Sequence, residues 1–176
     1  MAGAYPGHAE HARLFVALWP DIEVRDALQA WCGQWQWPAA TQRVPAQQLH
    51  LTLHFLGDVP RDQLPALQAA LRVPFTPFVL SLGRVALWPG GIAVLEPDRL
   101  SPPMARLHGA IGEALHGLDM ATEARAFRPH VSLARRAAAA VAPSAGPCIR
   151  WPVGGFALVE SHRPPRGGYE IVQAYP

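Results

Sequence analysis

Residues 49–56 read LHLTLHFL, and the alternation in this stretch decides how the chain can fold. Its apolar and polar side chains fall on opposite parities: Leu49, Leu51, Leu53 and Phe55 on one, His50, Thr52 and His54 on the other. Because successive side chains of a strand point to opposite faces, the pattern predicts a strand with one packed and one open face. The polar residues on the open face need a chemical explanation.

The composition is that of one globular domain. The chain has 176 residues, of which 50% are hydrophobic and 16% are charged, so it can bury a core and is not of the disordered class. It contains no apolar run of the roughly 18 to 20 residues that a membrane helix needs, and no signal pattern near its start. We expect a soluble, cytoplasmic monomer, with residues 1–12 as a flexible head and residues 13–176 as a single bilobal domain.

The cysteines and the charge exclude several function classes. Cys32 and Cys148 match no metal-ligand or redox spacing, which favours two free thiols in a reducing compartment. The formal charge of +2 is too small to indicate a long nucleic-acid footprint. All the basic residues are arginines, which suit bidentate phosphate contacts, although genomic composition would produce the same bias.

Strands and helices mix along the rest of the chain. Helical periodicity predicts a helix that opens at Pro20-Asp21 and ends at Trp37-Pro38, and helices over about 61–72 and 103–118. Apolar runs predict strands at 13–19, 49–56, 78–88, 91–96, 130–135, 154–161 and 168–175, with a hairpin turn at Pro89-Gly90-Gly91. Residues 135–147 are predicted to be a surface loop or a frayed helix. The mixture predicts an α+β fold with a largely antiparallel sheet.

The stretch HVSL at residues 130–133 repeats the form of HLTL at residues 50–53. Each follows strands and a helix, which predicts two similar lobes that face one another. In-line displacement at phosphorus places the attacking and leaving oxygens on opposite sides, so one of the two histidines, His50 and His130, can act as base and the other as acid without a metal. The hydroxyls of Thr52 and Ser132 can bind phosphate oxygens or fix the ring beside them.

The two extended motifs, HLTLHF at residues 50–55 and HVSLAR at residues 130–135, resemble those of the two-histidine phosphoesterases. The resemblance is specifically to the bacterial and archaeal RNA 2′,3′-cyclic phosphodiesterases, once called 2′-5′ RNA ligases, and runs through nearly the whole chain. It implies two largely antiparallel sheets flanked by helices around a central cleft. It also implies hydrolysis of the 2′,3′-cyclic phosphate on RNA ends or nucleotides to a 2′-phosphomonoester, with reversible 2′-5′ RNA ligase activity as a further expectation.

The resemblance also implies a role for each motif residue. His50 would be the general acid that protonates the departing 3′ oxygen, and His130 the general base that deprotonates water. Arg135 would hold the phosphate, and Phe55 would stack on the terminal base. The family requires no metal and no cofactor.

The sequence departs from a simple version of this scheme in two ways. Ser132 stands where the family usually has threonine, so the hydroxyl is kept but its rotamer is less restrained. Phe55 and Arg135 each lie five places after their histidine, where strict alternation would turn them to the opposite face. We therefore predict a bulge or bend that both strands share.

Two other functions remain open at this stage. A nucleotide- or RNA-binding module would keep the pocket without turnover, and a metal hydrolase would use His50, His54 and His130 but lacks well-placed carboxylates. Other residues with a possible role have a simpler structural reading, in which His54 is a half-exposed strand residue, Arg128, His108 and His116 are surface residues, and Trp19, Trp31 and Trp35 are core.

Overall fold

The computed structural model describes residues 10–176, and the predicted head at residues 1–12 lies mostly outside this range. The helices are α1 (Ile22–Cys32), α2 (Leu64–Ala70) and α3 (Pro102–His116). The strands are β1 (His11–Leu18), β2 (Gln42–Arg43), β3 (Leu51–Pro60), β4 (Phe78–Trp88), β5 (Ile92–Pro97), β6 (Val131–Arg135), β7 (Ile149–Val153), β8 (Phe156–Ser161) and β9 (Tyr169–Tyr175). Within the described part of the chain, no helix is long and apolar enough to cross a membrane.

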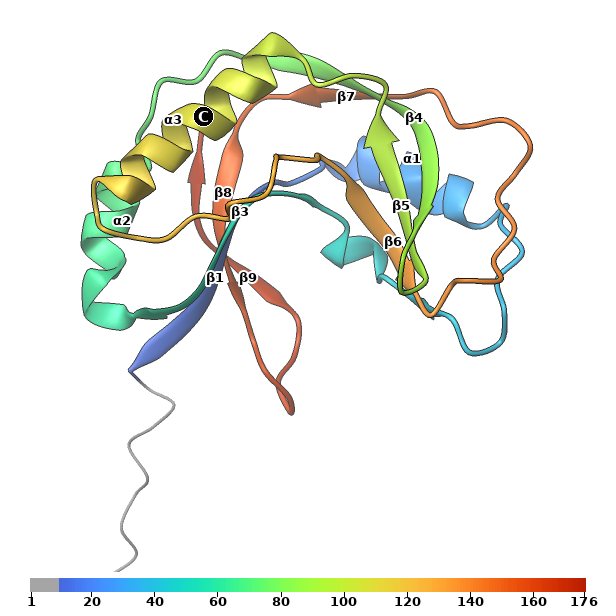
Figure 1. The fold of residues 1–176 in the computed structure, drawn as a ribbon, viewed down its shortest axis with the longest axis horizontal. Helices are drawn as coiled ribbons and strands as arrows, with labels where there is room; N and C mark the ends of the chain where they lie inside the picture. Colours follow the sequence, from blue (N-terminus) through green and yellow to red (C-terminus); the bar gives the residue numbers. More distant parts are fainter. Residues whose placement is uncertain (1–9) are drawn as a thin grey trace, which may run out of the picture.

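The strands form a curled sheet in the order β7-β4-β5-β6-β3-β1-β8-β9, with β2 added beside β6. Every strand pair among the described residues is antiparallel. The sheet has two halves, β7-β4-β5-β6 and β3-β1-β8-β9, which meet through one residue pair, Leu51 and Val131. Figure 1 shows the two halves on either side of this junction, with α2 and α3 on one side and α1 on the other. The predicted α+β class is confirmed, and the two expected sheets are joined at their edges.

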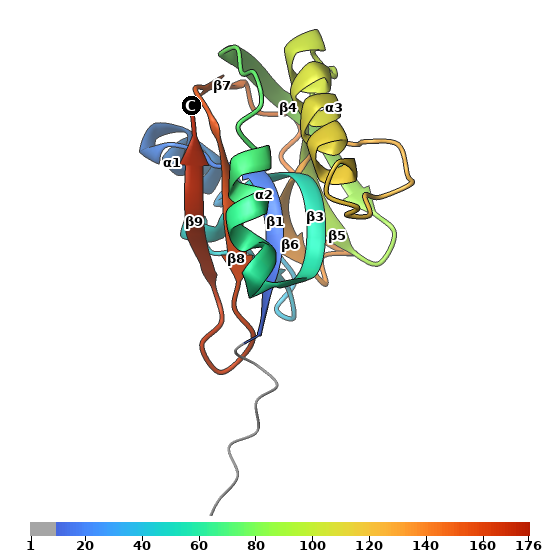
Figure 2. The ribbon, with the colours of Figure 1, turned by 90° about the vertical axis from the view of Figure 1, so that its left-hand side faces the viewer.

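The helices begin and pack as their sequences require. Asp21 caps α1 by accepting a hydrogen bond of 2.9 Å from the Val24 amide. Val24, Leu28 and Trp31 on one face of α1 are buried, and the helix packs against β7. On the other side of the molecule α3 packs against β3 and α2, a neighbourhood that Figure 2 views from the side.

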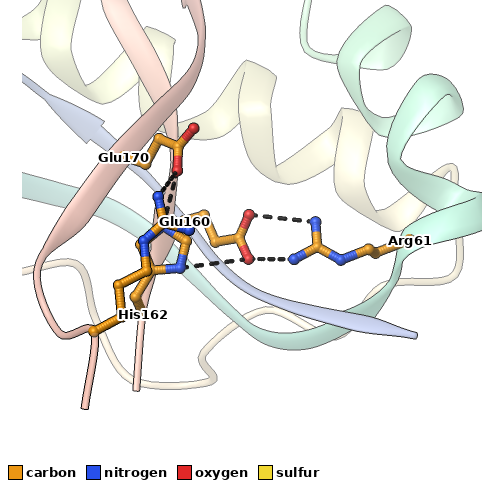
Figure 3. A network of polar contacts seen from close by, with 5 residues as sticks. Arg61, Glu160, His162 and Glu170 are labelled. Carbon is orange, nitrogen blue, oxygen red and sulfur yellow. Dashed lines mark hydrogen bonds and ion pairs between the residues drawn. The ribbon is translucent and has the colours of Figure 1, made fainter. Parts of the chain in front are cut away.

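The far end of the β3-β1-β8-β9 half is held by ion pairs. Glu160 on β8 accepts both guanidinium hydrogen bonds of Arg61, which follows β3. His162 lies between Glu160 and Glu170, with 2.9 Å from its Nε2 to the Glu170 carboxylate (Figure 3). These contacts join three strands of this half away from the junction.

The Leu51–Val131 pair gives a stability prediction, because both side chains are fully buried where the halves meet. We expect Leu51→Ala to lower the free energy of unfolding by about 2–5 kcal/mol, since it leaves a cavity that the fixed strands cannot close. Urea unfolding measures the loss. Val79→Ala, at a strand position that is 46% exposed, serves as the control. An equal loss in both variants would contradict a special role for the junction.

Candidate active site

The two motifs meet on one face of the strand junction. His50 precedes β3 directly and His130 precedes β6 directly. Because Leu51 and Val131 pair in antiparallel register and both point into the core, their sequence neighbours point to the opposite face. His50 therefore lies across from Ser132, and Thr52 lies across from His130. The structure brings both histidines and both hydroxyls of the predicted site together.

Each histidine ring is held in the same way. The Nδ1–H of His50 donates to the carbonyl oxygen of Gln48 at 2.7 Å, and the Nδ1–H of His130 donates to the carbonyl oxygen of Arg128 at 2.8 Å. A carbonyl oxygen only accepts, so the proton on Nδ1 is fixed in both rings. Nε2 is then the nitrogen that each ring can use to take or give a proton.

The surroundings of His50 are aromatic. Its ring stacks on Trp19 at 5.3 Å between centroids, and Phe15 and Tyr169 lie at 4.9 and 5.3 Å. Burial lowers the pKa of His50, the bond to Gln48 opposes this effect, and the charge of His130 lowers the pKa further. Trp19, which was predicted to be core, packs half-buried against a small buried cluster that includes Phe15, and it also forms a wall beside His50.

The surroundings of His130 are charged. The ring of Trp88 lies 4.3 Å from the His130 ring, and the Arg128 guanidinium lies 4.4 Å above the Trp88 ring. Burial lowers the pKa of His130, while the bond to the Arg128 carbonyl and the carboxylate of Glu96 act in the opposite direction. Arg128, predicted to be a plain surface arginine, has an exposed side chain but bonds Glu96 at 2.7 Å.

The predicted bend is present in both strands. On β3, Thr52 pairs with Ala17 and Phe55 pairs with Phe15, so one extra residue lies between them. On β6, Ser132 pairs with Val94 and Ala134 pairs with Ala93, which again leaves one extra residue. The extra residues are Leu53 and Leu133, each one place after the motif hydroxyl.

These bulges restore the parity that strict alternation would have lost. Phe55 returns to the face of Thr52 and is 42% exposed. Arg135 is likewise exposed, and the residue before each of them, His54 or Ala134, is buried. The bulges thus direct Phe55 and Arg135 toward the side of the sheet that carries the two histidines.

His54 does not share the face of His50, contrary to its parity in the sequence. It is 7% exposed, its Nε2 lies 2.8 Å from the carbonyl oxygen of His108, and its ring stacks on that of His108. The metal set of His50, His54 and His130 is therefore not assembled. Among residues 10–176, no three His, Cys, Asp or Glu side chains are grouped to hold a metal.

His108 was predicted to lie on the surface, but its ring is half-buried at the wall of the site. Its ring stacks between His54 and Phe127, with centroid distances of 4.1 and 3.9 Å. Burial, with a smaller effect from His54, lowers the pKa of His108 to about 4. His116, in contrast, is exposed as predicted and bonds the Thr122 hydroxyl.

The lowered pKa of His108 predicts a loss of stability in acid. The unfolded chain takes up a proton near its ordinary pKa of 6.5, whereas the folded ring takes it up only near 4. The lowered pKa of His108 therefore contributes stability to the folded state above pH 6.5. This contribution is lost as the pH falls from 6.5 to 4. His108→Phe keeps an aromatic ring in the stack but does not titrate. We expect its Tm to fall less than the wild-type Tm between pH 7 and pH 5, while His116→Gln behaves like the wild type.

A cavity of about 390 Å³ opens beside the motifs. Thr52, Phe55 and His130 line it next to the junction, together with Trp88. His50, Ser132 and Arg135 are not among its lining residues. Its farther wall is formed by His54, His108, Phe127, Glu123, Arg125 and Arg128. The cavity is large enough for a nucleobase, and most residues on the wall nearest the two histidines are aromatic.

Comparison with known proteins places this geometry in a family. Residues 22–165 match the family model described as the 2′-5′ RNA ligase superfamily. The chain belongs to this superfamily. The family predicted from the two motifs is therefore confirmed.

Relatives in the 2′-5′ RNA ligase superfamily include curated enzymes. The chain is 33% identical to an RNA 2′,3′-cyclic phosphodiesterase of Thermus thermophilus, over 93% of this chain and 89% of the relative. It is 31% identical to an RNA 2′,3′-cyclic phosphodiesterase of Escherichia coli, over 76% of this chain and 77% of the relative. In each comparison the alignment thus covers at least three quarters of the length of this chain and of the relative.

Solved structures in the superfamily share the whole fold. Escherichia coli LigT complexed with 3′-AMP superposes with a TM-score of 0.84 at 27% identity, covering 94% of this chain and 98% of LigT. LigT complexed with phosphate gives a TM-score of 0.81 at 26% identity, covering 95% and 98%. Both halves of the curled sheet are therefore shared with LigT.

Proposed function

We propose that this protein hydrolyses the terminal 2′,3′-cyclic phosphate of RNA, or of a nucleotide, to a 2′-phosphomonoester. The observation that carries the proposal is the pair of histidines on one face of the junction, each with Nδ1 bonded to a carbonyl and Nε2 left for proton transfer. The relatives described as RNA 2′,3′-cyclic phosphodiesterases support the choice of substrate.

In the proposed reaction the two rings work on opposite sides of phosphorus. Nε2 of His130 removes a proton from water as the water oxygen bonds to phosphorus. The bond from phosphorus to the 3′ oxygen breaks, and the Nε2–H of His50 protonates the departing 3′ oxygen. The phosphate stays on the 2′ oxygen. A 5′ hydroxyl in place of water would give a 2′-5′ linkage by the same steps.

The remaining motif residues bind the substrate in this proposal. The hydroxyls of Thr52 and Ser132 donate to phosphate oxygens, and Arg135 stabilises the charge that develops there. The exposed ring of Phe55 stacks on the base, for which the neighbouring cavity has room. No step requires a metal or a cofactor, and one chain supplies both histidines, so a monomer suffices.

A cytoplasmic location remains part of the proposal. The chain carries two free thiols, Cys32 and Cys148, which are typical of a reducing compartment.

The direct test is to incubate the protein with RNA that bears a cyclic phosphate end. We expect a product heavier by one water that resists a 3′-specific phosphatase, with equal yield in the presence of a chelator. Tight binding of a nucleoside 2′-phosphate without any hydrolysis would contradict the enzymatic proposal and identify a binding module. A requirement for added metal would contradict the proposed mechanism.

A further inference from the structure

Glu96 on β5 is a buried carboxylate to which the proposed mechanism gives no role. Glu96 is 5% exposed. Its strand, β5, pairs with β6, and β6 begins at the residue that follows His130. Burying a charge is costly unless well-placed donors surround it. The partners of Glu96 therefore indicate what the residue does.

One oxygen of Glu96 holds two side chains at once. Its Oε1 accepts hydrogen bonds from Nε1 of Trp88 at 3.2 Å and from Nε of Arg128 at 2.7 Å. Its Oε2 lies 3.8 Å from the guanidinium of Arg84, whose side chain is exposed. The two bonds to Oε1 fix Trp88 and Arg128 relative to each other, with the guanidinium above the indole ring.

Both side chains that Glu96 fixes belong to residues in contact with His130. The Trp88 ring packs on the imidazole at 4.3 Å, and the Arg128 carbonyl accepts the Nδ1 proton. We propose that Glu96 is a positioning residue for His130, which acts through Trp88 and Arg128 and places a negative charge behind the ring. This inference rests on the proposed function, in which His130 exchanges a proton with water.

The charges around the two histidines differ, which supports this role. Burial lowers the pKa of His130, the bond to the Arg128 carbonyl and the carboxylates of Glu96 and Glu123 raise it, and the Arg128 guanidinium lowers it. For His50, burial and the charge of His130 lower the pKa, and only the bond to the Gln48 carbonyl raises it. The lobe of His130 thus contains a buried carboxylate where the lobe of His50 contains Trp19 and Tyr169. Among the described residues, a carboxylate therefore acts on the pKa of His130, and none acts on that of His50.

The variant Glu96→Gln separates the charge from the geometry. An amide oxygen in the place of Oε1 can accept both existing hydrogen bonds, while the negative charge is lost. We expect the NMR titration of the His130 ring to move to lower pH, because the protonated ring loses a stabilising charge. The limb of the pH profile of kcat/KM that reports the titration of His130 should also move to lower pH.

The variant Glu96→Ala removes both bonds as well as the charge. We expect kcat to fall about 10- to 100-fold, as when a group that orients a reacting imidazole is lost, with KM changed much less. Glu160→Gln is the matched control, because Glu160 is a largely buried, arginine-bonded carboxylate in the other half. In Glu160→Gln, both the NMR titration of His130 and the pH profile of kcat/KM should match those of the wild type.

The outcomes are distinguishable from a failure of the proposed function. The ring titration needs no substrate, so it reports on Glu96 even in a protein that hydrolyses nothing. A His130 titration in Glu96→Gln that superposes on the wild type, or an equal shift in Glu160→Gln, would overturn the inference. Thermal unfolding of all three variants shows whether each is folded, and a folded Glu96→Ala with wild-type kcat would also overturn it.

Discussion

Replacing either His50 or His130 with alanine is expected to lower kcat for hydrolysis of an RNA 2′,3′-cyclic phosphate by about 10²- to 10⁴-fold. The physical reason is that each ring carries one proton transfer of a single displacement, and a positioned acid or base contributes an effect of this size. Because the two rings act together, the double variant should lose little more than either single variant. Single-turnover rates with a cyclic-ended oligonucleotide measure the effect.

The control for the histidine variants is His116→Ala. His116 is exposed at the end of α3 and bonds only the Thr122 hydroxyl among the contacts described for it, so its loss should leave kcat unchanged. Full activity in a folded His50→Ala or His130→Ala protein would contradict the assignment of both roles.

Arg135→Ala is expected to have the second-largest effect, a fall in kcat of about 10²- to 10³-fold. The bulge at Leu133 turns this arginine toward the histidine face, where its guanidinium can meet the charge that develops on phosphate oxygens. Arg135→Lys restores the charge but not the two parallel hydrogen bonds, so its activity should lie between those of the alanine variant and the wild type.

Arg106→Ala, at an exposed position of α3, is the matched control for loss of one surface arginine. Steady-state rates over a range of substrate concentrations separate an effect on kcat from one on KM. A change in KM alone for Arg135→Ala would contradict a role in stabilising the transition state and leave only a role in binding.

The strand at residues 49–56 was predictable because its alternation reflects burial on one side of a sheet. The repeat of its motif at residues 130–133 predicted the two facing lobes, the pair of histidines and the bend that both strands share. The offset of Phe55 and Arg135 indicated the bulges, since both residues otherwise pointed away from their histidines. β7 was not predicted, because its five residues contain a proline and follow an irregular stretch.

The walls of the site were not predictable from the sequence. Trp19, Trp88 and Glu96 lie on or beside three different strands, and the pairing of β4 with β5, of β5 with β6 and of β1 with β3 brings them to the histidines. Each looked like an ordinary strand residue in its own segment. His108 was missed for a related reason, because its partners His54 and Phe127 come from distant parts of the chain.

The two lobes use one motif in two different settings. His50 lies among aromatic rings, whereas His130 lies beside a buried carboxylate and an arginine. Since the backbone bond to Nδ1 is the same in both lobes, the side chains around each ring determine how readily it takes a proton.

The central claim is that both imidazoles meet one phosphate group. Titrating the protein with a nucleoside 2′-phosphate while recording the ring signals of His50 and His130 by NMR tests it most directly. The account predicts that both signals shift along one saturation curve with a single Kd, while the signal of His116 stays in place. A shift of only one ring, or two different Kd values, would contradict it.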